Sequence, residues 1–165
     1  MRKTLIATCL ALALPLVSTA QAETSPDPAL VAAVANPARS AQFSARDAAR
    51  KPVEVLSFAG LKPDLTVVEI GPGAGYWTEV LAPYLAKQGT FYTAITPRAA
   101  SERAATAADN WAKKLESNEA TWGKVRISDF GKGVSSVAPA GTADVVLTFR
   151  NVHNWMAAGF AEEAF

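Results

Sequence analysis

The segment from Val67 to Tyr76 reads V-V-E-I-G-P-G-A-G-Y, and it limits the possible fold more than any other feature. Leu65 to Ile70 is a run of apolar and β-branched residues broken only by Glu69. A run without alternation is typical of a strand buried on both faces of a parallel sheet. The glycine loop Gly71 to Gly75 follows, and apolar residues at helical spacing predict a helix over Tyr76 to Ala86. We therefore expect a strand, a tight loop and a helix in succession.

The rest of the chain alternates between predicted strands and helices. Further strands are expected at Phe91 to Ile95, Val125 to Ile127 and Val145 to Phe149, with helices over Ala99 to Leu115 and from about Ala157 onward. Such alternation predicts βαβ units with right-handed crossovers. The predicted fold class is therefore α/β, a parallel sheet with flanking helices. In such sheets ligands bind beyond the carboxyl ends of the strands, so the residues that follow each strand are the candidate site.

The first 22 residues have the pattern of a secretory signal peptide. Arg2 and Lys3 give a positive start, Leu5 to Val17 is apolar, and Ala20-Gln21-Ala22 supplies the small residues that a signal peptidase reads. The alternative is a membrane anchor, but the apolar run is shorter than the roughly 20 residues that span a bilayer. We expect cleavage after Ala22, no stable membrane span after cleavage, and a periplasmic or secreted bacterial protein.

The remaining chain is expected to form one domain. Residues 23–37 contain three prolines and little periodicity, which indicates a linker or disordered lead-in. Residues 38–165 form the predicted domain, which begins with an amphipathic helix over Ala38 to Arg50. Pro52 can open a second short helix, and Gly60 can end it.

Charge and cysteine usage exclude several classes of function. The 16 basic residues nearly balance the 15 acidic ones, so nucleic acid is not an expected partner. The only cysteine is Cys9, inside the predicted signal peptide, so the mature chain would have neither disulfides nor a thiol nucleophile. With a single histidine in the chain, we expect no metal site.

The string E-I-G-P-G-A-G, Glu69 to Gly75, resembles motif I of the class I S-adenosylmethionine-dependent methyltransferases, which have a Rossmann-like fold. Two further strings, R-K-P-V-E-V-L-S-F-A-G-L-K-P from Arg50 to Pro63 and R-N-V-H-N-W from Arg150 to Trp155, resemble a group of predicted bacterial methyltransferases with export signals. The resemblance runs from about Ala45 to the end of the chain. It implies S-adenosylmethionine as the cofactor.

The resemblance also implies how the cofactor is held. Gly71, Gly73 and Gly75 would pack under its methionine part, with Glu69 assisting. In this family an acidic residue at the end of the second strand holds the ribose hydroxyls, but this chain reads A-I-T-P there and offers only Thr96. A position after the third strand contacts the adenine amino group, and Asp129 fits it; the alternative for Asp129 is a helix cap or a solvated carboxylate.

The acceptor would lie beyond the fourth strand, where the chain reads R-N-V-H-N-W. Asn151 is a candidate substrate contact. His153 is a candidate general base, because its charge changes near neutral pH, although a lone histidine is more often structural. Trp155 can stack on an acceptor ring or simply pack in the core. We interpret Trp111 and Trp122 as packing residues.

The sequence thus predicts methyl transfer to an unidentified small-molecule acceptor, with catalysis mainly by positioning. One alternative is a non-catalytic nucleotide-binding module or an inactive fragment of this fold. A nicotinamide-dependent oxidoreductase is a weaker alternative, because Tyr76 occupies the position of the third glycine of a dinucleotide fingerprint.

The family has seven strands, whereas four are readable here. We therefore expect residues 38–165 to be the N-terminal part of a methyltransferase domain whose last three strands are missing. Such a chain, with an apolar fourth strand at an unpaired edge, is expected to have low stability and no turnover by itself.

Overall fold

The computed structural model describes residues 25–165. Within them one four-stranded sheet has all its strands parallel, in the order β3-β2-β1-β4. The strands are β1 (Thr66–Ile70), β2 (Thr90–Ile95), β3 (Arg126–Asp129) and β4 (Val145–Thr148). The predicted α/β class with a parallel sheet is confirmed. The signal peptide over residues 1–22 lies outside the described residues, so export to the periplasm stays a prediction.

The order of the strands reverses beside β1. From β1 the chain proceeds outward to β2 and β3, and it then returns to place β4 on the other side of β1. Val67 of β1 is accordingly opposite both Phe91 of β2 and Val145 of β4. The loops that follow two neighbouring strands at such a reversal run to opposite faces of the sheet. A crevice therefore opens between them at the carboxyl ends of the strands.

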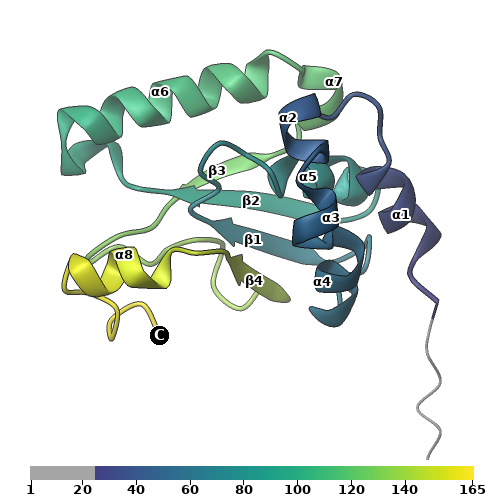
Figure 1. Cartoon of the computed structure of the whole chain (residues 1–165). Coiled ribbons are helices and arrows are strands. Elements are labelled where there is room, and N and C mark those ends of the chain that lie inside the picture. The colour runs from purple at the N-terminus through teal and green to yellow at the C-terminus, as the bar shows by residue number, and fades with distance from the viewer. Residues whose placement is uncertain (1–24) are drawn as a thin grey trace, which may run out of the picture.

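Helices cover both faces of the sheet, and Figure 1 shows α6 and α8 on opposite sides of it. The helices are α1 (Pro28–Val34), α2 (Ala41–Ser44), α3 (Asp47–Arg50), α4 (Pro52–Phe58), α5 (Thr78–Leu85), α6 (Glu102–Glu116), α7 (Glu119–Trp122) and α8 (Val152–Ala157), with a 3₁₀ turn η1 (Arg98–Ala100). Within residues 25–165, none of these helices combines the length and the apolar character that crossing a membrane would need.

Burial on both faces explains why the apolar residues of β1 do not alternate with polar ones. Val67 and Val68 are neighbours whose side chains point to opposite faces, and both are fully buried. Val67 belongs to the larger core, together with residues of α1, α4, α5 and α6. Val68 belongs to a smaller core on the other face, with Phe130 and Trp155. Each core therefore rests on one face of the same sheet.

The lead-in predicted over residues 23–37 is wrong in its central part, which forms helix α1. Asp27 caps the helix, since its carboxylate accepts a hydrogen bond from the backbone N–H of Ala29 at 2.8 Å, and Pro28 occupies the first turn. Tyr84 donates a hydrogen bond to Asp27 at 2.7 Å, and Leu30 is 1% exposed. The Asp-Pro pair is a helix-start signal that a count of prolines obscures.

Two other predicted helices also differ from the structure. The single helix expected over Ala38 to Arg50 is divided into α2 and α3, and Asp47 at the start of α3 accepts hydrogen bonds from Arg39, which precedes α2, and from Tyr76. The helix expected to begin near Ala157 instead ends there. Gly159, with a φ of 72°, turns the chain, and Phe160 then packs against Trp155. Left-handed glycines commonly stop helices in this way.

Candidate functional site

The loop after β1 has a backbone conformation that requires its glycines. Gly71, Gly73 and Gly75 have φ angles of 67°, 58° and 96°, all in the region that residues with a side chain avoid. The loop ends at α5, and it lies beside the β1–β4 reversal. The three glycines nevertheless differ in what surrounds them.

Gly71 allows the side chain of Asn151 to approach the loop. A Cβ atom at Gly71 would lie 2.6 Å from Asn151 Nδ2. That amide donates hydrogen bonds to the carbonyl oxygens of Ile70 at 3.0 Å and Gly71 at 3.2 Å, and contacts the Thr148 hydroxyl at 3.0 Å. Asn151 therefore ties the end of β4 to the end of β1. The predicted substrate contact is first of all a clamp on the loop.

Gly75 allows α6 to pack against the other side of the loop. A Cβ atom there would lie 3.1 Å from the Trp111 ring and 3.2 Å from Lys114 Nζ. Lys114 donates a hydrogen bond to the carbonyl oxygen of Ala74 at 2.5 Å, and the Trp111 indole donates one to the Thr93 hydroxyl at 3.0 Å. Packing within the protein therefore explains why this position requires glycine.

Gly73 is the glycine that faces open space. A Cβ atom built at Gly73 would meet no heavy atom within 4 Å. Gly73 lines two cavities, which lie on either side of the loop. Of the three loop glycines, Gly73 is thus the one whose missing side chain leaves room for something other than this protein.

Three neighbouring cavities surround the loop, and all three are lined by Gly71 and Asn151. The β2-side cavity, of about 650 Å³, also has Thr96, Trp111 and Lys114 in its wall. The β4-side cavity has about 450 Å³ and contains His153. The third, here the α8 cavity, has about 610 Å³. Each has the volume of an ordinary small-molecule site.

The predicted residues after β2 and β3 are placed differently. Thr96 directly follows β2, is exposed, and lines both the β2-side and the α8 cavities. Asp129 is the last residue of β3 and is exposed, but it does not line any of the three cavities. The next residue, Phe130, lines the α8 cavity. The structure thus brings Thr96 to the site and leaves Asp129 beside it.

Glu69 is a buried carboxyl group at the β4-side cavity. It is 2% exposed, and it accepts a hydrogen bond of 2.6 Å from the hydroxyl of Thr78. Burial raises the pKa of Glu69 to about 7, and the bond from Thr78 opposes that shift only in part. This group can therefore hold a proton close to neutral pH.

His153 and Trp155, both on α8, have different surroundings. His153 is exposed and lines the β4-side cavity. Trp155 is 7% exposed and packs against Phe130 with ring centroids 5.0 Å apart. It also forms part of the wall of the α8 cavity. Trp155 is therefore a core residue with one side on the α8 cavity, and its stacking on an acceptor ring stays a prediction.

The N-terminal helices bring to the loop residues that no sequence motif indicated. Phe43, Arg46 and Arg50 line the β4-side cavity together with Tyr76. The Tyr76 hydroxyl donates a 2.6 Å hydrogen bond to Asp47, which fixes α3 over the loop. No local pattern indicates these contacts, because they join segments that are distant in the sequence.

The clamp leads to a prediction for Asn151→Asp. An aspartate would place a carboxylate oxygen against the carbonyl oxygens of Ile70 and Gly71, where Asn151 now supplies a donor. We expect the free energy of unfolding at pH 8 to fall by about 1–3 kcal/mol. Denaturant unfolding measures this, with Asn154→Asp as a control at an exposed position of α8. Equal stabilities for the two variants would contradict the clamp.

Comparisons with models of known protein families, with curated proteins and with solved structures find no match to this chain. The function is therefore inferred from the geometry of the loop and its cavities.

Proposed function

We propose that the cavities around the glycine loop bind S-adenosylmethionine, that the fold is that of a class I methyltransferase, and that the site transfers a methyl group to a small acceptor. The observation that carries the proposal is Gly73. It combines a left-handed backbone with open space, at the carboxyl edge of the sheet and beside the strand-order reversal. A ligand can approach the backbone closely there, because no side chain intervenes.

The residues present fit such a cofactor. The loop at Gly73 would support its methionine part, and Thr96 would offer one hydrogen bond to the ribose. The α8 cavity has a largely apolar wall that includes Pro97, Phe130 and Trp155, which suits a flat purine ring. Asp129 stays a proposed adenine contact, and it would need to turn toward the α8 cavity to make one.

The bound cofactor supplies an electrophilic methyl group, and the residues of this chain position its acceptor. Alignment is the main requirement of such a transfer. The β4-side cavity lies across the loop from Thr96 and would hold the acceptor. His153 lines that cavity and is our candidate base for an acceptor atom that must lose a proton.

Nicotinamide dinucleotides fit this site less well. A dinucleotide fingerprint would have its third glycine at Tyr76. Tyr76 is instead a buried residue, 4% exposed, whose hydroxyl is bonded to Asp47. In addition, the neutral Thr96 cannot make the charge-assisted pair of bonds to a ribose that a carboxylate makes. A non-catalytic nucleotide-binding module remains the second candidate, because the same cavities would serve it.

Calorimetric titration of the full chain tests the proposal. We expect S-adenosylhomocysteine to bind at least about tenfold more tightly than NAD, a difference of about 1.4 kcal/mol. Tighter binding of NAD, or no binding of S-adenosylhomocysteine, would contradict the proposed cofactor. Binding without methyl transfer to any acceptor tested would favour the non-catalytic module.

A further inference from the structure

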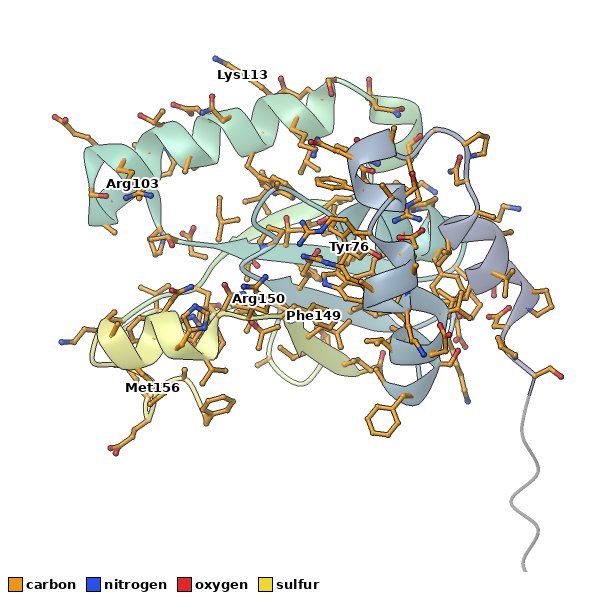
Figure 2. All side chains as sticks on the ribbon, viewed as in Figure 1. Tyr76, Arg103, Lys113, Phe149, Arg150 and Met156 are labelled. Atoms are coloured by element: carbon orange, nitrogen blue, oxygen red, sulfur yellow. The ribbon has the colours of Figure 1, made fainter. Side chains whose placement is uncertain are left out.

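Three arginines converge on the β4-side cavity, and we call Arg46, Arg50 and Arg150 the arginine cluster. Arg46 lies between α2 and α3, Arg50 ends α3, and Arg150 follows β4. Figure 2 shows Arg150 close to Tyr76 and Phe149, in the region where the N-terminal helices meet the carboxyl ends of the strands. The fold therefore gathers like charges from two distant segments around one cavity.

Among the residues that the structure describes, no carboxylate pairs with the arginine cluster. Within residues 25–165, none lies within 4.0 Å of these three guanidinium groups. The nearby Asp47 is already engaged, because Arg39 holds both of its oxygens, at 2.7 and 2.9 Å, and the Tyr76 hydroxyl adds a third bond. Glu69 at the same cavity is buried, it is hydrogen-bonded to Thr78, and burial raises its pKa to about 7.

The like charges of the cluster repel one another, and Arg50 is partly buried whereas Arg46 and Arg150 are exposed. Burial is the first cause that lowers the pKa of Arg50, and the charges of Arg46 and Arg150 add to it. Arg150 has a φ of 63°, a conformation that costs a non-glycine residue about 1 kcal/mol or more. Arg50 stacks over the Tyr76 ring, with its guanidinium carbon 4.2 Å from the ring centroid. Strained backbone of this kind is common at ligand-binding and active sites.

The walls of the cavity indicate what the ligand carries besides its charge. Aromatic side chains line the cavity beside the arginines: Phe43, Tyr76, Trp77 and Phe149. Trp77 and Phe149 are stacked, with ring centroids 4.1 Å apart and planes 19° apart. A flat apolar body fits such walls, and guanidinium forks match a carboxylate in shape as well as charge.

We propose that the arginine cluster binds the anionic group of the methyl acceptor, and that this acceptor is a small aromatic carboxylic acid. The proposal rests on the proposed function, in which the β4-side cavity holds the acceptor. The other source of a carboxylate is the methionine part of the cofactor, and the experiment separates the two.

The test follows the tryptophan indole N–H signals of the full chain by NMR while benzoate or benzyl alcohol is added. Trp77 in the cavity wall provides a local reporter. Benzoate is expected to bind more tightly than the neutral benzyl alcohol. Arg50→Gln and Arg150→Gly should each weaken benzoate binding at least about tenfold, the scale of a lost charge-assisted hydrogen bond. Equal binding of the two probes, or no benzoate binding, overturns the proposal.

Two controls keep the result interpretable. Arg150→Gly relieves the positive φ, so it should fold at least as well as the unmodified protein while it loses the guanidinium. Arg103→Gln removes the same charge from the start of α6, at a residue that lines none of the three cavities, and should leave benzoate binding unchanged (Figure 2). If Arg103→Gln weakens benzoate binding as much as Arg50→Gln does, the proposal that benzoate binds at the arginine cluster is wrong.

Titration with S-adenosylhomocysteine separates the two carboxylates. Arg50→Gln and Arg150→Gly are expected to leave its affinity within about twofold of the unmodified protein. Weakened S-adenosylhomocysteine with unchanged benzoate would assign the cluster to the cofactor and overturn the proposal. Absence of S-adenosylhomocysteine binding, together with arginine-dependent benzoate binding, would instead contradict the proposed function and leave the carboxylate site standing.

Discussion

Replacing Glu69 by glutamine is expected to raise the free energy of unfolding by about 3 kcal/mol at pH 8 and to leave it nearly unchanged at pH 4. Glu69 is fully enclosed, and the bond from Thr78 is its one hydrogen bond among the described residues. Ionising such a carboxyl group costs free energy, because the low-dielectric interior does not solvate the charge. Glutamine can accept the same bond from Thr78 without carrying a charge.

The direction with pH follows from the raised pKa. Burial moves the pKa of Glu69 from 4.5 to about 7 in the folded chain. Below pH 4.5 both the folded and the unfolded states bind the proton, so Glu69 contributes its full stability there. Between pH 4.5 and 7 the unfolded state releases the proton first, and the contribution is lost as pH rises. The stability of the unmodified protein should therefore decline across this window.

Denaturant unfolding at several pH values from 4 to 8 measures both proteins. Subtracting one profile from the other cancels the groups that they share. Glu116→Gln removes the same charge from an exposed position at the end of α6, and it should leave the pH profile of the unmodified protein in place. If the free energy of unfolding of the two proteins has the same pH dependence, ionisation of Glu69 in the folded state has little energetic cost and the expectation is contradicted.

Gly73→Ala is expected to weaken the binding of S-adenosylhomocysteine about a hundredfold or more, which corresponds to about 2.7 kcal/mol. The new methyl group would meet no protein atom within 4 Å, so it would project into the space between the β2-side and β4-side cavities. A ligand that lies against the backbone of the loop cannot occupy that space as well. The comparison uses the calorimetric affinity of the unmodified protein.

A matched control separates this effect from backbone strain. Gly141 has a φ of 74°, also has no heavy atom within 4 Å of a Cβ position, and lines none of the three cavities. Alanine at either position should cost about 1 kcal/mol of stability, because both backbones are left-handed. Gly141→Ala should keep full affinity for S-adenosylhomocysteine. A folded Gly73→Ala protein with unchanged affinity would rule out ligand binding at the loop.

Much of the fold could be predicted because its signals are local. The strands β1, β2 and β4 each appear as short apolar runs, and their residues agree with the predicted ranges within about one residue at each end. The glycine loop could be predicted because three closely spaced glycines between a strand and a helix indicate a tight turn of the backbone. Helix α1 also has a local signal, the pair Asp27-Pro28 at its start. The prediction of a disordered lead-in rests on proline content and does not use this signal.

The partners of the loop could not be predicted in the same way. Asn151 Nδ2 reaches Ile70 across 81 positions, and Lys114 reaches Ala74 across 40. Similarly, the arginine cluster joins Arg46 and Arg50, on either end of α3, to Arg150, two residues after β4. A local pattern does not indicate which distant side chain contacts the loop. That contact depends on the order of the strands and on the face of the sheet that each helix covers.

A parallel α/β sheet with a glycine loop at the end of its first strand is predictable from the sequence, since apolar periodicity and backbone freedom are properties of residues that are close along the chain. The packing of distant segments establishes that Gly71 and Gly75 contact other side chains while Gly73 faces open space. It also decided that Asp129 lies outside the cavities and that the arginines lie beside one of them. These are distances between segments, and only the packing of helices on the sheet sets such distances.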